Sequence, residues 1–367
     1  MEDPRYLSEQ LITYIGNKRA LLPLIGRGLE FAVERLEGSR DGRVILDLFS
    51  GSGVVSRFFK RFADRLIVND LEGYAEVLSR CYLANLDGKQ RRELEAVHAD
   101  LLLSLHDGTL QPGLIAKDYA PRDQDDIQAG ERAFYTPQNA AYLDTARRLV
   151  GELPAELRPF FLGPLLTEAS IHANTAGVFK GFYKDRHTGL GRFGGTGQDA
   201  LTRITQPIRL PFPIFSRFNR DFEVHRRDAN ELVRRLPPVD IAYIDPPYNQ
   251  HPYGSNYFML NLLVDYQEPR EVSPVSGIPV TWNRSAYNKR AHAWPAMRDL
   301  VDQIDARVLM ISMNSESLID INELIAHLNT RGETQVFSSD YATFRGSRNL
   351  RGRSLTVTEF LLVTLTQ

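Results

Sequence analysis

Short runs rich in valine and isoleucine alternate with longer, helix-length segments over much of this 367-residue chain, and this alternation leaves few folds open. Strands that alternate with helices form a parallel sheet covered by helices on both faces. The expected strands are residues 43–49, 65–70, 222–227, 239–245, 307–313, 335–338 and 355–365. We therefore predict a doubly wound, mostly parallel, seven-stranded α/β sheet whose last strand could run antiparallel.

The alternation stops between about residues 100 and 222, where polar and Pro/Gly-rich pieces surround a helical stretch near 136–149. So long a stretch without strands is typical of an insertion with structure of its own. The predicted organisation is a first part of the core domain at 1–100, an insertion at 101–220 and a second part of the core domain at 221–367.

Composition excludes several classes of protein. No apolar run approaches the roughly 20 residues that span a bilayer, and the N-terminus lacks the features of a secretory signal. Cys81 is the only cysteine, so an intramolecular disulfide and a structural zinc site are not expected, and a cytoplasmic location fits. The eight histidines show no ligand spacing, so no metal is predicted.

The net charge of −2 is not typical of a nucleic-acid-binding protein, but the average conceals a basic segment. Residues 171–220 carry eight Lys or Arg against Asp185 and Asp199, a local charge of +6. The basic residues are Lys180, Lys184, Arg186, Arg192, Arg203, Arg209, Arg217 and Arg220. Such a segment suits a face that binds a polyanion, although a solvated surface explains it equally well.

A glycine loop follows the first expected strand and opens a helix, in Asp47-Leu-Phe-Ser-Gly-Ser-Gly. Gly51 and Gly53 allow a tight turn and close approach of a ligand to the helix N-terminus. The loop lacks the Gly-Lys-Ser/Thr ending of a P-loop, and Ser56 replaces the third glycine of a dinucleotide fingerprint. Asp70, at the end of the second strand, is placed either to accept hydrogen bonds from a ribose or to cap a helix.

The fourth expected strand ends in Asp245-Pro-Pro-Tyr, which is the most informative stretch of the chain. The strand delivers Asp245 to the sheet edge where ligands bind. Pro246 and Pro247 stiffen the turn and leave carbonyls free as acceptors, while Tyr248 adds an aromatic face. The Asp245 carboxylate and the Pro246 carbonyl could hold both hydrogens of an aromatic amine, and Tyr248 could stack on its ring.

These motifs resemble those of the Dam-like, alpha-group adenine-specific DNA methyltransferases, which share the class I, Rossmann-like methyltransferase fold. The resemblance implies S-adenosylmethionine as cofactor and 101–220 as the target-recognition region. Thr13-Tyr-Ile-Gly-Asn-Lys-Arg resembles the first cofactor motif, with the lysine facing the methionine carboxylate. The implied cofactor-binding residues are Tyr14, Lys18, Asp47, Phe49, Ser50, Gly51, Gly53, Asp70 and Asp228. The implied catalytic residues are Asp245, Pro246, Pro247 and Tyr248.

The same resemblance implies residues that bind DNA. The segment 174–197 falls where the family recognises its target, and 341–349 resembles a loop beside the flipped base. The implied phosphate-binding residues are Lys180, Lys184, Arg186, Arg192, Arg345 and Arg348, although a plain surface loop is an alternative for the last two.

The implied activity is methyl transfer to the N6 amine of a flipped adenine in double-stranded DNA. The role that the resemblance implies is either restriction–modification, with a cognate endonuclease as a possible partner, or stand-alone epigenetic marking. Two alternatives stay open from the residues. One is an RNA adenine methyltransferase, because related motifs also modify RNA, and the other is a non-catalytic DNA-binding protein of the same fold.

Overall fold

The computed structural model describes residues 2–36, 42–195, 197–342 and 356–367, which form two compact units. The sheet unit contains residues 18–71, 218–252 and 284–367, and the helical unit contains residues 1–17, 72–217 and 253–283. Both units are assembled from three separate stretches of the chain. All strands of the predicted sheet belong to the sheet unit.

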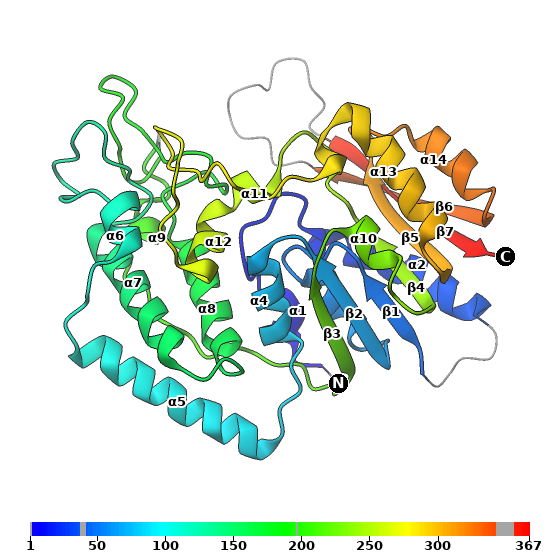
Figure 1. The fold of residues 1–367 in the computed structure, drawn as a ribbon, viewed down its shortest axis with the longest axis horizontal. Coiled ribbons are helices and arrows are strands. Elements are labelled where there is room, and N and C mark those ends of the chain that lie inside the picture. Colours follow the sequence, from blue (N-terminus) through cyan, green and yellow to red (C-terminus); the bar gives the residue numbers. More distant parts are fainter. Residues whose placement is uncertain (1, 37–41, 196, 343–355) are drawn as a thin grey trace. The chain divides into compact units, whose positions relative to one another are not determined.

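The sheet has seven strands in the order β3-β2-β1-β4-β5-β7-β6 (Figure 1). The strands are β1 Val44–Asp47, β2 Arg65–Asp70, β3 Asp221–Arg226, β4 Val239–Ile244, β5 Ala306–Asn314, β6 Gly332–Ala342 and β7 Thr356–Thr366. Strands β1 to β5 run parallel to one another, whereas β7 is antiparallel to β5 and to β6. The predicted doubly wound, mostly parallel sheet is confirmed.

The sixth strand is longer than the predicted 335–338. It lies at the edge of the sheet, with Glu333, Gln335 and Ser338 exposed. An edge strand that faces solvent contains many polar residues, so its composition does not mark its ends clearly.

Helices cover both faces of the sheet. Leu46 of β1 and Leu309 of β5 pack with Met297 of α13 in one buried cluster. Successive side chains of a strand point to opposite faces, and on the other face the ring of Phe59 in α3 lies 5.5 Å from that of Tyr243 in β4. The helices of this unit are η1 Lys18–Leu21, α2 Leu22–Arg35, α3 Val54–Phe59, α10 Ala229–Val233, η2 Ala286–Asn288, α13 Arg290–Gln303 and α14 Ile321–Leu328.

The helical unit is built around buried aromatic rings. Phe134, Phe179 and Phe258 contact one another with ring centres 6.0–6.4 Å apart. Its helices are α1 Pro4–Ser8, α4 Gly73–Tyr82, α5 Gly88–Asp107, α6 Leu114–Tyr119, α7 Pro137–Glu152, α8 Arg158–Ile171, α9 Leu201–Thr205, α11 Tyr253–Asn256 and α12 Phe258–Asp265. Among the described residues, no helix combines the length and apolar character that a membrane span needs.

Candidate active site

The strand order of the sheet reverses between β1 and β4, and open α/β sheets bind ligands at such a point. Backbone hydrogen bonds extend the sheet beyond the ends of these strands. The Leu48 N–H donates to the Tyr243 carbonyl at 3.0 Å, and the Ser50 N–H donates to the Asn69 carbonyl at 2.9 Å. The glycine loop and the Asp-Pro-Pro-Tyr turn therefore leave the same edge of the sheet.

The glycine loop has the backbone that its sequence predicts. Gly51 and Gly53 adopt φ values of 50° and 74°, in the left-handed region that favours glycine. A Cβ built on Gly53 would meet nothing within 4 Å, so the turn has open space beside it. The Gly51 N–H donates to Oδ2 of Asp70 at 2.8 Å, which joins two of the predicted cofactor residues directly.

Two buried polar atoms beside this loop lack a hydrogen-bond partner within the described parts of the chain, namely Oδ1 of Asp47 and Oγ of Ser50. The other oxygen of Asp47 accepts a hydrogen bond from the Ser56 hydroxyl. Burial raises the pKa of Asp47 to about 7, against the Ser56 hydrogen bond and with the help of the Asp245 charge. Buried acceptors without donors, next to an open glycine turn, fit a ligand that brings its own N–H groups, such as an ammonium.

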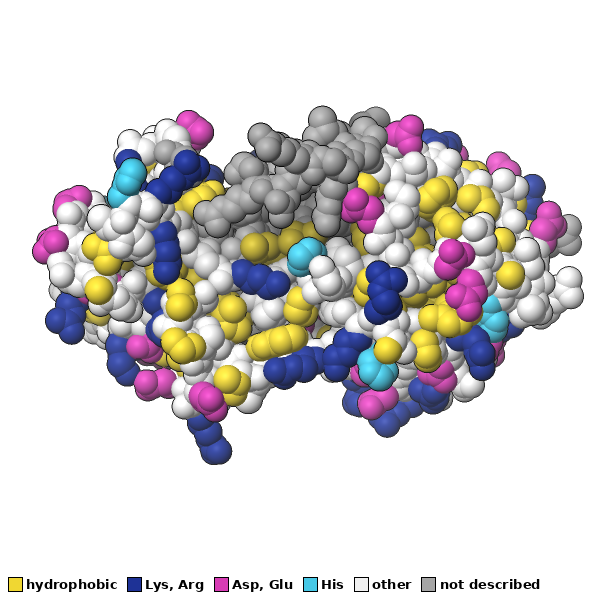
Figure 2. All heavy atoms as spheres, turned by 90° about the horizontal axis from the view of Figure 1, so that it is seen from above, with side chains coloured by type: hydrophobic (Ala, Val, Ile, Leu, Met, Phe, Trp, Pro, Cys, Tyr) yellow, Lys and Arg dark blue, Asp and Glu magenta, His cyan; other side chains and the backbone are white. Residues whose placement is uncertain are grey.

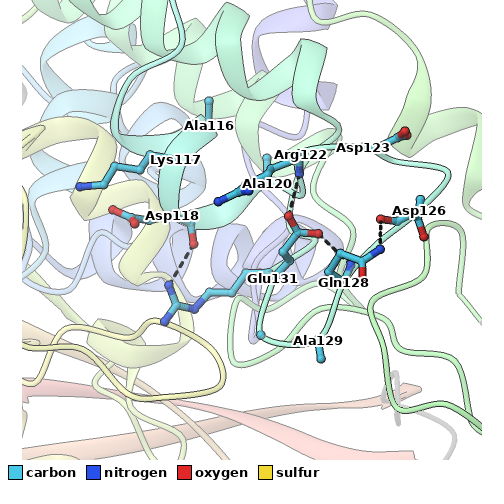
Figure 3. A pocket seen from close by; sticks show the side chains of 12 residues that line it. Ala116, Lys117, Asp118, Ala120, Arg122, Asp123, Asp126, Gln128, Ala129 and Glu131 are labelled. Carbon is cyan, nitrogen blue, oxygen red and sulfur yellow. Dashed lines mark hydrogen bonds between the residues drawn. The ribbon is translucent and has the colours of Figure 1, made fainter.

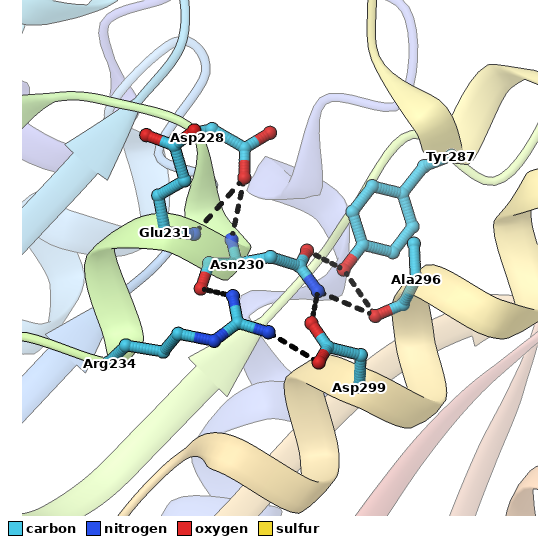
Figure 4. A network of polar contacts seen from close by, with 7 residues as sticks. All are labelled: Asp228, Asn230, Glu231, Arg234, Tyr287, Ala296 and Asp299. Atoms are coloured by element: carbon cyan, nitrogen blue, oxygen red, sulfur yellow. Dashed lines mark hydrogen bonds and ion pairs between the residues drawn. The ribbon is translucent and has the colours of Figure 1, made fainter.

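Asp228 caps the helix that follows β3 (Figure 4). Its Oδ1 accepts from the N–H groups of Asn230 and Glu231 at 3.0 and 3.2 Å, and the residue is exposed. Asn230 in turn accepts a hydrogen bond from the Tyr287 hydroxyl at 2.9 Å. The Tyr287 ring meets the ring of Phe49 edge-on, with centres 5.4 Å apart. This network joins the predicted residues Phe49 and Asp228 through Tyr287, which the sequence analysis missed.

Asp245 follows β4 directly and forms an ion pair with Lys18, with 3.1 Å between Lys18 Nζ and Asp245 Oδ1. Lys18 is only 3% exposed, and its Nζ also donates to the Tyr248 hydroxyl at 3.0 Å. The Tyr248 carbonyl accepts from the Leu318 N–H at 2.9 Å, which holds the end of the turn. The structure thus brings Lys18, predicted as a cofactor residue, into contact with two predicted catalytic residues.

The charges of this cluster depend on one another. Burial alone would lower the pKa of Lys18, but the charges of Asp245, Tyr248 and Glu359 outweigh it and raise the pKa well above its ordinary value. Burial raises the pKa of Asp245 to about 6, although Lys18 opposes the shift. Asp245 is therefore an ionised acceptor at neutral pH and loses that state in mild acid.

Glu359 of β7 is the second site residue that the sequence analysis missed. It is 4% exposed, and its Oε2 lies 3.8 Å from Lys18 Nζ. Its signal in the sequence is a single carboxylate in the apolar run 355–365, on the same strand face as the buried Val357 and Leu361. A lone charge at an inward position of a strand needs a partner, which here is Lys18.

Tyr14 belongs to the helical unit, where its ring stacks on two other tyrosines. Its ring centre lies 4.9 Å from that of Tyr253 and 4.8 Å from that of Tyr257, with 24° between the planes in both pairs. The backbone of Ile15 is held by the same residues, since its N–H donates to the Tyr257 hydroxyl at 2.7 Å and its carbonyl accepts from Tyr253. These contacts fix the segment that leads to Lys18.

The predicted DNA-binding residues of the helical unit lie on or beside a short hairpin, in which Lys184 pairs with Gly191. Lys180, Lys184, Arg186 and Arg192 are exposed, and Arg192 forms an ion pair of 3.2 Å with Asp185. Figure 2 shows Lys and Arg side chains interspersed with acidic and hydrophobic ones on the visible face. Arg345 and Arg348 lie outside the described residues.

None of the predicted site residues lines the open pocket of about 720 Å³ in the helical unit (Figure 3). Its charged side chains hold the surrounding loop. Arg132 donates to the Asp118 carbonyl at 3.0 Å, and Glu131 accepts from the backbone of Arg122 and Gln128 at 3.1 and 2.8 Å. We therefore interpret this surface as loop structure rather than as a reaction site.

A protein-family model described as D12 class N6 adenine-specific DNA methyltransferase matches residues 14–111 and 169–274, more than half of the chain. The chain is 27% identical to the Type II methyltransferase M.NlaIII of Neisseria lactamica over 92% of this chain and 93% of that protein. It is 28% identical to the Type II methyltransferase M.CviAII of Paramecium bursaria Chlorella virus 1, over 84% and 86%. The Modification methylase StsI of Streptococcus sanguinis is 27% identical over 92% of this chain but only 49% of its own length.

Proposed function

The chain belongs to the D12 class of N6 adenine-specific DNA methyltransferases, and from this premise we propose its substrate, cofactor and residue roles. The substrate is an adenine in double-stranded DNA, rotated out of the stack so that its N6 amine reaches the carboxyl end of β4. The observation that carries the proposal is Asp245, held by Lys18 at the point where the strand order reverses.

Asp245 and the turn after it orient the amine. The amine of adenine is a poor nucleophile because its lone pair is delocalised into the ring. Two acceptors, the Asp245 carboxylate and the Pro246 carbonyl, hold its two hydrogens and turn the lone pair outward. Pro247 stiffens the turn, and Tyr248 stacks on the base, which is worth about 1–3 kcal/mol in other proteins. Much of the acceleration then comes from proximity and orientation.

We propose S-adenosylmethionine as the cofactor, which supplies a methyl group on a sulfonium when bound. The loop from Asp47 to Gly53, including Phe49, would hold its methionine part, where Asp47 Oδ1 and Ser50 Oγ have no hydrogen-bond partner among the described residues. Asp70 would accept from the ribose and Asp228 from the adenine ring. Tyr14 and Lys18 remain predicted cofactor residues, as the alpha-group resemblance implies.

We further propose that the chain modifies DNA within a restriction–modification system and protects sites that a cognate endonuclease cuts. The supporting observation is that the named relatives are Type II methyltransferases and modification methylases. DNA methylated by the purified protein should resist an endonuclease that recognises the mapped site, while the same DNA treated without cofactor should be cut.

The test of the central proposal is transfer of labelled methyl from S-adenosylmethionine to unmethylated DNA by wild type and Asp245→Ala. We expect label on N6 of adenine at one short sequence, mapped by sequencing, and a loss of at least about 100-fold in the variant. RNA competing better than duplex DNA would move the substrate to RNA. Cofactor binding without turnover on any nucleic acid would indicate a non-catalytic protein.

A further inference from the structure

Three charged side chains form a buried cluster in the sheet unit, and only two of them belong to motifs of the sequence. Lys18 Nζ lies 3.1 Å from Oδ1 of Asp245 and 3.8 Å from Oε2 of Glu359. The Lys18 and Glu359 side chains are 3% and 6% exposed, and that of Asp245 is 15% exposed. The ammonium of Lys18 thus pairs with two carboxylates, so the cluster has a formal charge of −1 and is largely shielded from solvent.

The backbone holds Glu359 firmly in place. Near the start of β7, Glu359 pairs with Asn314, the last residue of β5, on one side and with Ser339 of β6 on the other. The Asn314 amide donates to its Oε1 at 3.4 Å, whereas Oε2 has no hydrogen bond within the described residues and faces Lys18. A buried carboxylate oxygen without a hydrogen bond is costly, so an ordinary core would not keep one.

We propose that Glu359 is a positioning residue of the methyl transfer, acting through Lys18. It draws the ammonium of Lys18 into the position from which Lys18 binds Asp245 Oδ1 and the Tyr248 hydroxyl. Asp245 is then held with its second oxygen toward the substrate amine. This inference rests on the proposed function, since it assigns a residue to that same reaction.

The charge of the cluster suits the reaction as well as its geometry does. Formation of the nitrogen–carbon bond as the carbon–sulfur bond breaks would turn the sulfonium into a neutral thioether and move its positive charge to the amine. The amine would then release a proton to solvent water. A net charge of −1 in a low-dielectric site stabilises that developing positive charge. Without Glu359, the pair of Lys18 and Asp245 would be neutral.

The first experiment compares wild type with Glu359→Gln, which keeps the shape of the side chain and removes its charge. We expect kcat to fall roughly tenfold, less than the hundredfold or more typical of a group at the reacting atoms, with KM for DNA changed little. Glu333→Gln makes the same change at the exposed edge strand β6, opposite Leu365, and should leave kcat unchanged. Cofactor affinity and melting temperature are measured for both variants to confirm that they fold.

The pH profile separates this role from a purely structural one. Asp245 is faced by Lys18 of η1, Glu359 of β7, Asp47 of β1 and the tyrosines Tyr243 and Tyr248. Glu359 raises the pKa of Asp245 and Lys18 lowers it. The pH below which kcat falls should therefore be lower in Glu359→Gln and higher in Lys18→Met than in wild type. This fall is the acid limb of the pH profile of kcat. Glu359→Asp, which keeps the charge, should retain the limb closer to that of wild type.

A double-mutant cycle tests whether Glu359 acts through Lys18. In the Lys18→Met background, Glu359 is an unpaired charge near Asp245, so Glu359→Gln should leave kcat unchanged or raise it. An equal loss in both backgrounds, or an unchanged kcat and acid limb in Glu359→Gln, would overturn the inference while wild type still transfers methyl. Wild type that transfers no methyl to any DNA would overturn the proposed function, and this inference with it.

Discussion

At the scale of single residues, Asp47 links the site to the pH dependence of stability. Its pKa is about 7 in the folded protein against an ordinary value of 3.8, because burial disfavours the charged form. The folded state therefore holds this proton more tightly than the unfolded chain does. The stabilisation is complete below pH 4 and is lost as the pH rises through about 7.

Asp47→Asn removes this titration, since an amide does not ionise. We expect the free energy of unfolding of wild type to fall relative to the variant between pH 5 and 7, by at most about 1.4 kcal/mol per pH unit. Urea unfolding at pH 5, 6, 7 and 8 without cofactor measures the difference. Parallel curves for the two proteins would contradict the prediction.

Asp144 of α7 accepts hydrogen bonds from the start of α6. Its Oδ2 accepts from the N–H groups of Gly113 and Ala116 at 2.7 and 2.9 Å, and its Oδ1 accepts from the Ile115 N–H and the Tyr266 hydroxyl at 2.9 and 2.7 Å. The side chain therefore caps α6 and joins it to α7. Its loss would leave the buried Ile115 N–H and three partly buried donors without this acceptor.

We expect Asp144→Ala to lower the free energy of unfolding by about 3 kcal/mol or more, because each buried unsatisfied donor costs about 1–3 kcal/mol. Arg148→Ala removes an exposed ion pair with Glu152 from the same helix and should change stability by less than about 1 kcal/mol. Denaturant unfolding of both variants gives the comparison. Similar losses in the two would show that the Asp144 network is not stabilising.

At the scale of elements, α2 packs closely against β7 through a glycine. A Cβ on Gly28 would lie 2.3 Å from Cδ2 of Leu361, and Leu361 is 1% exposed and cannot move freely. Two residues earlier, a Cβ on Gly26 would meet only Phe58 at 3.5 Å, an ordinary contact. Packing against β7 therefore requires glycine at position 28 but not at position 26.

Gly28→Ala should destabilise the protein by about 1–3 kcal/mol through overpacking, although alanine favours helix. Gly26→Ala should be neutral or stabilising by up to about 1 kcal/mol, since only the helix propensity changes. The melting temperatures of the two variants, compared with that of wild type, test this prediction. Two stabilised variants would mean that α2 and β7 do not pack as closely as the structure has them.

At the scale of the whole molecule, the distribution of charge determines which surface binds a polyanion. The net charge is −2, yet residues 171–220 carry +6. If Lys180, Lys184, Arg186 and Arg192 contact phosphates, binding must weaken with salt. Replacing all four with Gln should reduce the slope of log K against log salt by up to about 4, because each neutralised phosphate contributes about 0.9 to that slope.

The control replaces Lys89 and Arg92, exposed on α5 of the same unit, and should leave the slope unchanged. Binding of duplex DNA is measured between about 50 and 200 mM salt, the range over which phosphate contacts have a large effect. Equal slopes of log K against log salt for wild type and the quadruple variant would show that these four residues do not contact DNA phosphates.

Local patterns were enough to predict the seven strands, the glycine loop and the turn at Asp245. Strand periodicity and turn residues are properties of short segments, so they can be recognised from the local sequence. The order of the motifs carried the resemblance to adenine-specific DNA methyltransferases, which the match to the D12 class confirms at that level. The roles of the individual site residues stay predictions.

Tertiary structure alone decided which of those residues meet. Sequence spacing does not say that Lys18 contacts Asp245 and Tyr248, nor that Tyr287 joins Phe49 to the Asp228 helix. Glu359 stands in a late strand that returns antiparallel, and only the pairing of β7 with β5 brings its carboxylate to Lys18. Contacts between distant segments depend on sheet order and register, which are set by the packing of the whole core rather than by any one segment.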